Sequence, residues 1–176
     1  MAKKIKRKII VSGRPRSGTS LMMRILDVSG YTCARDLEWE QSLERKISNP
    51  YFYESKSLIK GKKIDFGKNT AAKIFVNKLD MIEDPENYFV IWMHRNRESM
   101  FASWDSYNRK SRAKITNEED YARHNKNLIL ERFKHVIIDY DSLIETPKQE
   151  LKKFTKLIKI NKYLAIQEID PGLRHF

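Results

Sequence analysis

The residues best suited to chemistry form one short segment near the start of the sequence. In order, they are Gly13, Arg14, Pro15, Arg16, Ser17, Gly18, Thr19 and Ser20. The two glycines permit a tight turn whose backbone N–H groups point inward, and Arg16 adds a cation to three neighbouring hydroxyls. A loop of this kind is suited to hold an anion such as a phosphate or a sulfonate.

The elements on either side place this loop between a strand and a helix. The β-branched run Ile9-Ile10-Val11 predicts a buried strand. After the loop, apolar residues recur at helical spacing over residues 21–26, and Gly30 supplies a stop. Because the N-terminus of a helix has unpaired N–H groups and the positive end of its dipole, this placement favours anion binding.

The loop resembles a phosphate-binding P-loop in which the cation has moved. A P-loop for nucleoside triphosphates has Lys after its second glycine, where this sequence has Thr19. The cation stands instead at Arg16, two residues before Gly18. We therefore expect a phosphate that bears a sulfonate to fit this loop better than a triphosphate.

The remaining patterns predict one domain over residues 1–176, with a P-loop-like three-layer α/β/α fold and a short, mostly parallel sheet. Three more apolar runs are continuous rather than alternating, as expected for parallel strands covered on both faces. They span residues 71–76, 88–93 and 136–138.

Helices are expected between these strands. One is predicted over residues 118–133, preceded by a surface loop over residues 105–117, which are polar and basic. Thr146 and Gln149 predict a capping box around Pro147, the favoured first residue of a helix.

The formal net charge of +12 indicates anionic partners, among which nucleic acid, a membrane surface and a multiply charged nucleotide would all qualify. The lysines are spread along the whole sequence, which argues against a nucleic-acid-binding module. The single cysteine, Cys33, excludes a disulfide framework, and no apolar run approaches the length of a membrane span. We expect a cytoplasmic protein and leave its oligomeric state open.

Residues 15–20 resemble the 5′-phosphosulfate loop of the sulfotransferase family, which typically reads Pro-Lys/Arg-Ser-Gly-Thr-Ser/Thr. A second signature of that family is an Arg at the end of a later strand with a Ser eight residues further on. Arg95 and Ser103 have this spacing. Weaker similarities lie in residues 49–54 and 136–147.

The resemblance implies that 3′-phosphoadenosine 5′-phosphosulfate (PAPS) is the sulfonate donor and that no metal is required. The loop from Arg14 to Ser20 would hold the 5′ end of PAPS, and Arg95 with Ser103 would hold its 3′-phosphate by a bidentate guanidinium and a hydroxyl. Arg174, in a basic segment near the end of the sequence, is a further candidate for the 3′-phosphate.

The resemblance also implies in-line attack of the acceptor on sulfur, with Arg16 stabilising the developing charge. Lys73 is a candidate contact for the sulfonate. Many members use a His two residues after such a Lys as the general base, but this sequence has Phe75 there. Glu54 is therefore the candidate base.

Three other interpretations stay open on the sequence. A degenerate P-loop kinase of nucleotides or small molecules would bind ATP with magnesium, and a basic nucleic-acid-binding module would use the positive charge. A family member without activity would account for the short chain and the missing His. The acceptor of a sulfotransferase could be a small molecule, a saccharide or a peptide.

Overall fold

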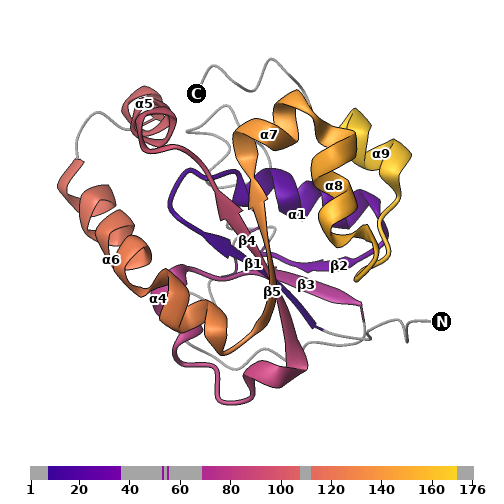
Figure 1. The fold of residues 1–176 in the computed structure, drawn as a ribbon, viewed down its shortest axis with the longest axis horizontal. Helices are drawn as coiled ribbons and strands as arrows, with labels where there is room; N and C mark the ends of the chain where they lie inside the picture. Colours follow the sequence, from indigo (N-terminus) through magenta and orange to yellow (C-terminus); the bar gives the residue numbers. More distant parts are fainter. Residues whose placement is uncertain (1–7, 37–52, 54, 56–68, 108–111, 170–176) are drawn as a thin grey trace.

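The structure is a computed structural model, and it describes residues 8–36, 53, 55, 69–107 and 112–169. These residues form a central sheet with helices on both faces (Figure 1). The strands of the described part are β1 Lys8–Gly13, β2 Thr32–Ala34, β3 Thr70–Lys73, β4 Tyr88–His94 and β5 Lys134–Asp139. All of their pairings are parallel, and the strand order is β2-β3-β1-β4-β5.

The helices lie in two layers, one on each side of the sheet. The described helices are α1 Thr19–Val28, α4 Val76–Leu79, α5 Arg97–Tyr107, α6 Arg112–Glu131, α7 Tyr140–Glu145, α8 Pro147–Thr155 and α9 Lys162–Gln167, with a 3₁₀ turn at Pro85–Asn87. Figure 1 shows α4 and α6 on one side of the strands and α1, α8 and α9 on the other. None of these helices combines the length and the apolar character needed to cross a lipid bilayer.

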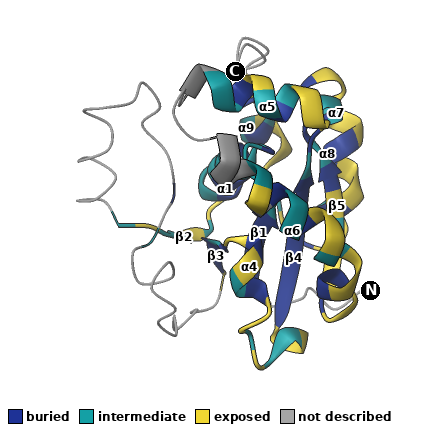
Figure 2. Cartoon of the chain, turned by 90° about the vertical axis from the view of Figure 1, so that its left-hand side faces the viewer, coloured by how far each residue is buried: buried dark blue, intermediate teal, exposed yellow. Residues whose placement is uncertain are grey.

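The two faces of the sheet carry separate hydrophobic cores, and β1 contributes to both. Ile9 and Val11 pack into the core formed with α1, α7, α8 and α9. Ile10, between them, packs into the core formed with α4 and α6. Because both faces are covered, the interior strands are mostly apolar, which explains the continuous apolar runs, and the buried hydroxyl of Ser12 in β1 is paired with the carbonyl oxygen of Ile74 at 2.7 Å. Figure 2 shows the same for β4, which is buried from Tyr88 to Met93.

The topology creates a place for a ligand at one edge of the sheet. Strand β1 lies in the middle, with β3 on one side and β4 on the other. Where the chain order reverses in this way, the loops at the carboxyl ends of the parallel strands diverge and leave a crevice. The Gly13–Ser20 loop, Lys73 and Arg95 all follow or end these three strands.

The α/β fold class with a parallel sheet, predicted from the sequence, is confirmed. Each predicted strand is present, although the one expected over residues 71–76 ends at Lys73. The prediction of a surface loop over residues 105–117 is wrong, because α5 continues to Tyr107 and α6 begins at Arg112. That stretch contains no Gly or Pro, and its Arg, Lys and Ala residues are good helix formers.

The predicted capping box at the start of α8 is also wrong. Pro147 is the first helical residue as expected, but the side chain of Thr146 makes no capping bond. The Thr146 hydroxyl donates instead to the carbonyl oxygen of Ser142 at 3.1 Å. Thr146 is both the last capping residue of α7 and the residue before α8, so its hydroxyl can reach the carbonyl oxygen of Ser142 in α7.

Candidate anion-binding site

The Gly13–Ser20 loop packs directly on the end of β4 and the start of α7. A Cβ atom at Gly13 would lie 2.2 Å from the carbonyl oxygen of Met93, and one at Gly18 would lie 2.2 Å from Cδ2 of Tyr140. Both glycines have positive φ angles, and Arg16 adopts a φ of 59°. A non-glycine residue in this region is strained and persists only where its surroundings hold it.

Helix α1 follows the loop directly, and its first N–H groups have no partners within the helix. Gly18 is the N-cap residue and offers no side chain to satisfy them. The hydroxyl of Ser17 is used inside the loop, where it donates to the carbonyl oxygen of Arg14 at 2.6 Å. Ser17 therefore stabilises the turn, and the start of α1 offers its N–H groups and its dipole to an anion.

Three residues predicted to bind the ligand meet in one basic cluster. Arg16 Nε donates to Ser103 Oγ at 3.1 Å, and Arg95 Nη1 donates to the carbonyl oxygen of Arg16 at 3.3 Å. Ser103 is 2% exposed and Arg95 is 5% exposed. The loop after β1, the end of β4 and helix α5 are thus joined by hydrogen bonds between residues that are distant in sequence.

The Arg95 guanidinium lies over an aromatic ring. Its Cζ atom is 4.4 Å from the ring centroid of Tyr140, which is the geometry of a cation–π interaction. Arg95 Nε is 3.9 Å from Asp141 Oδ1, and the other oxygen of Asp141 accepts a hydrogen bond from Asn96 at 2.7 Å. The sequence patterns did not single out Tyr140 and Asp141 as site residues. The available signal was their position directly after a predicted strand.

Lys73 reaches the loop from the opposite side. It ends β3, and its Nζ donates to Ser20 Oγ at 3.4 Å. Because β3 and β4 flank β1, the loop has Lys73 on one side and Arg95 on the other. Phe75, two residues after Lys73, is 42% exposed.

A buried ion cluster ties the loop to α6. Arg14 Nη2 pairs with Glu119 Oε1, and Arg97 Nε lies 3.7 Å from Glu119 Oε2. The Glu119 side chain is 0% exposed. A fully buried carboxylate is costly unless it is paired, so the Arg14 guanidinium has a structural partner here. Nothing in the sequence pattern distinguished Glu119 from the other acidic residues of its helix.

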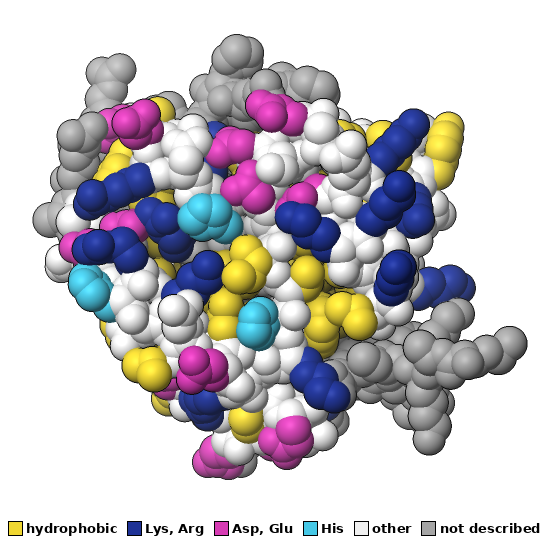
Figure 3. Space-filling view, in the orientation of Figure 1, with side chains coloured by type: hydrophobic (Ala, Val, Ile, Leu, Met, Phe, Trp, Pro, Cys, Tyr) yellow, Lys and Arg dark blue, Asp and Glu magenta, His cyan; other side chains and the backbone are white. Residues whose placement is uncertain are grey.

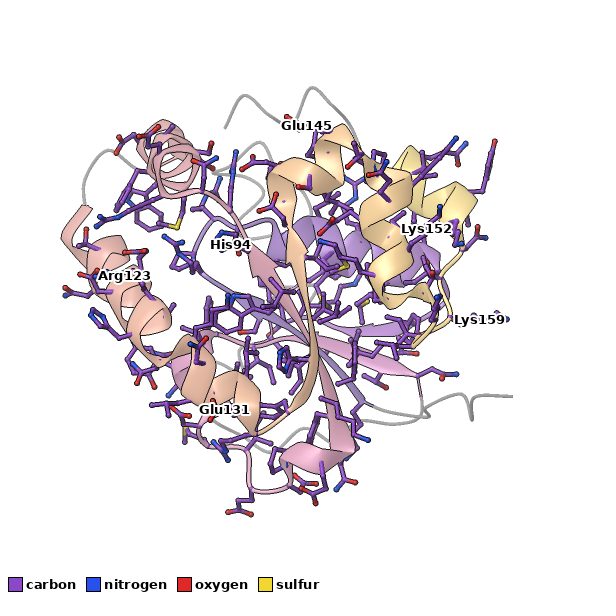
Figure 4. The ribbon with its side chains drawn as sticks, in the orientation of Figure 1. His94, Arg123, Glu131, Glu145, Lys152 and Lys159 are labelled. Carbon is purple, nitrogen blue, oxygen red and sulfur yellow. The ribbon has the colours of Figure 1, made fainter. Side chains whose placement is uncertain are left out.

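His94 lies at the end of β4 (Figure 4), where the charge of Arg14 acts on it. Burial lowers the pKa of His94, and the positive charge of Arg14 lowers it further. The neutral imidazole is therefore favoured at neutral pH.

Two predicted site residues, Glu54 and Arg174, lie outside the described residues. The described part of the chain contains no group of three or more His, Cys, Asp and Glu side chains that could hold a metal ion.

No protein-family model matches the chain, and no curated protein matches its sequence. Its fold is similar to the sulfotransferase domain from the curacin biosynthetic pathway, with a TM-score of 0.54, 12% identity, and coverage of 96% of this chain and 79% of that chain. A retinol dehydratase in complex with androsterone and the inactive cofactor PAP has a TM-score of 0.50 and 12% identity over 95% of this chain, which spans 64% of that protein's length. An unliganded sugar kinase from Janibacter sp. HTCC2649 has a TM-score of 0.46 and 13% identity, over 96% of this chain and 98% of that one.

We expect Gly18→Ala to destabilise the protein through both its backbone angle and the Tyr140 ring. Gly30→Ala is the matched control, because Gly30 has the same φ of 89° but nothing within 4 Å of an added Cβ. The control should lose about 1–2 kcal/mol of unfolding free energy, and Gly18→Ala about 2 kcal/mol more, in urea denaturation. Equal losses would show that Tyr140 does not constrain the loop.

Glu119→Ala should destabilise the protein by about 3–5 kcal/mol, because it leaves the mostly buried Arg14 guanidinium without its partner. Asp120→Ala is the comparison, since the neighbouring carboxylate is 40% exposed and pairs with Arg123 at 3.3 Å. That variant should lose less than about 1 kcal/mol. Urea denaturation measures both, and a similarly small loss for Glu119→Ala would contradict a supporting role for the cluster.

The lowered pKa of His94 predicts how stability changes with pH. As the pH falls below the ordinary histidine value of about 6.5, the unfolded state takes up a proton before the folded state does. His94 therefore reduces the unfolding free energy progressively below that pH and has no such effect above it. His94→Asn should flatten this decline, measured by urea denaturation between about pH 8 and about pH 5. An unchanged slope would show that His94 titrates normally.

Proposed function

We propose that this protein is a sulfotransferase that moves a sulfonate group from PAPS to a hydroxyl or amine acceptor. The observation that carries the proposal is the hydrogen bond between Arg16 and Ser103, with Arg95 bonded to the Arg16 carbonyl group. These two bonds connect the Gly13–Ser20 loop, which is suited to bind one anionic group, with Arg95 and Ser103, which are suited to bind a second one. PAPS carries two such groups, at its 5′ and 3′ positions, whereas ATP carries a single polyphosphate chain.

The chemistry of the donors fits phosphate and sulfonate oxygens. Each guanidinium can donate to two oxygens at once, and Lys73 adds a point charge beside Ser20. Arg95 Nη1 reaches the backbone carbonyl oxygen of Arg16 at 3.3 Å, so an anion held at the loop would meet positive charge from both residues. The absence of Lys after Gly18 disfavours the β/γ pair of a triphosphate.

In the proposed reaction, the acceptor oxygen or nitrogen forms a bond to sulfur while the bond between sulfur and the bridging phosphate oxygen breaks. The acceptor loses a proton to a base, and adenosine 3′,5′-bisphosphate leaves with the negative charge of the bridging oxygen. Arg16 would stabilise that charge, and Lys73 would hold the sulfonate. The protein then acts by positioning and by charge stabilisation, as in phosphoryl transfer.

We propose Glu54 as the base, because Phe75 has no proton-accepting atom at the position of the family's His. Arg174 would add positive charge near the 3′-phosphate. Arg14 would contribute its backbone N–H, since its side chain pairs with Glu119, and Pro15, which has no N–H, would contribute by fixing the backbone of the turn. The acceptor would be a small molecule, a saccharide or a peptide. The likeness of the fold to a sulfotransferase domain and to a protein crystallised with PAP supports the proposal.

Titration calorimetry with adenosine 3′,5′-bisphosphate should detect binding to the wild-type protein without magnesium. Arg16→Ala and Arg95→Ala should each weaken binding by about 10- to 100-fold, because each removes charge-assisted hydrogen bonds worth about 1.5–3 kcal/mol. Ser103→Ala should weaken it by about 10-fold or less, since a neutral hydroxyl contributes about 1 kcal/mol.

Arg132→Ala is the matched control for these variants. Its guanidinium bonds to Asp80 and to the carbonyl oxygen of Ile82, on the face of the sheet covered by α4 and α6, and its loss should leave binding unchanged. If the wild-type protein does not bind the bisphosphate, the proposed donor is wrong. Tighter binding of ATP with magnesium would favour a kinase instead.

A further inference from the structure

Positive charge is concentrated in the segment from Pro147 to Gln167, which forms α8, α9 and the turn between them. This segment contains six lysines and a single acidic residue, Glu150. The lysines are Lys148, Lys152, Lys153, Lys156, Lys159 and Lys162, and all six are exposed. We refer to these six residues as the lysine surface.

Packing of α8 explains why the lysines point outward together. Glu150, Leu151 and Phe154 are buried, and the lysines occupy exposed positions of the helix. Lys148, Lys152 and Lys156 recur every four residues and therefore lie on one face. Like charges at this spacing destabilise a helix by about 0.2–0.5 kcal/mol per pair, although the helix dipole favours cations in the last turn.

Internal partners neutralise little of this charge. Lys153 Nζ donates to Glu150 Oε1 at 2.6 Å, and the same oxygen accepts the backbone N–H of Asp139. Among the described residues, the other five lysines make no ion pair. Figure 3 shows Lys and Arg side chains gathered on the right of the view, over α8 and α9.

The lysine surface also contains a pocket and apolar side chains. A pocket of about 730 Å³ is lined by Lys152, Lys156, Lys159 and Lys162 together with Leu157 and Ile160. Leu157 is 37% exposed, and Tyr163, which follows Lys162, is 71% exposed. Exposed Leu and Tyr beside several lysines is the composition of a surface that enters the boundary between lipid headgroups and acyl chains.

We propose that the lysine surface binds the surface of an anionic lipid membrane. Clusters of four to eight basic residues on a helix are attracted to anionic headgroups, and Lys159 projects outward from the turn (Figure 4). The six cations are all lysines, which act as flexible point charges rather than as the planar forks that read phosphates in a nucleic-acid groove. Leu157 would meet the acyl boundary, for which the sugar-phosphate backbone of a nucleic acid offers no counterpart.

The lysine surface lies apart from the Gly13–Ser20 loop. The backbone N–H of Asn161 donates to Ser29 Oγ at 3.1 Å, so the turn between α8 and α9 meets the chain just beyond the C-terminal end of α1. The loop precedes the opposite end of α1. Membrane binding therefore does not depend on the proposed transfer activity.

Vesicle co-sedimentation of the full chain tests this proposal. The wild-type protein should bind vesicles of phosphatidylcholine with one third phosphatidylserine and not vesicles of phosphatidylcholine alone. The triple variant Lys152→Gln, Lys156→Gln, Lys159→Gln should bind the anionic vesicles roughly a hundredfold more weakly, because each lysine near a membrane contributes roughly fivefold. The matched control, Lys78→Gln, Lys126→Gln, Lys134→Gln, has the same net charge and should change binding by less than about threefold.

A second variant tests the apolar contribution and separates membranes from nucleic acid. Leu157→Ser with Tyr163→Ser should weaken vesicle binding severalfold while circular dichroism shows the fold unchanged. Lack of wild-type binding to the anionic vesicles would overturn the proposal, as would equal losses in the two triple variants. Displacement of the vesicles by single-stranded DNA, with no effect of Leu157→Ser and Tyr163→Ser, would also overturn it and identify a nucleic-acid surface.

Discussion

Close packing at Gly13 and Gly18 determines the geometry of the candidate site. Because neither residue has a side chain, the loop lies against the Met93 carbonyl group and the Tyr140 ring, where a Cβ atom would be 2.2 Å away in each case. The Tyr140 ring also makes the cation–π contact with the guanidinium of Arg95, which follows β4. The positions of the cations thus depend on two glycines, which have no side chain with which to bind a ligand.

The acidic residues near the loop divide its arginines into two groups. Glu119 is fully buried and pairs with Arg14, which therefore has a fixed internal partner, while the exposed Arg97 lies 3.7 Å from its other oxygen. Asp141 is 34% exposed and lies 3.9 Å from Arg95, a distance at which the attraction is weaker and partly screened. We infer that Arg95 can exchange Asp141 for a ligand at little cost, whereas Arg14 cannot leave Glu119.

Most of the fold and half of the site's framework could be predicted, because those signals are local in sequence. The strand Ile9-Ile10-Val11, the loop and the helix that follows are adjacent in sequence. Arg95 directly follows β4, and Ser103 lies in α5, the next helix along the chain. The contributions of Glu119 and Tyr140 could not be predicted, since they depend on which elements pack together. The start of α6 was mistaken for a loop because charged residues occur equally in loops and on solvated helices.

The strand order also decides when this chain can fold during its synthesis. Strand β1 is central, and its Ile9 pairs with Ala71 of β3 and Phe89 of β4. Both partners leave the ribosome long after β1, and closing such long loops is slow compared with local helix formation. The apolar strand therefore waits unpaired on the nascent chain until β3 has been made, and one of its edges stays open to aggregation and to chaperones until β4 follows.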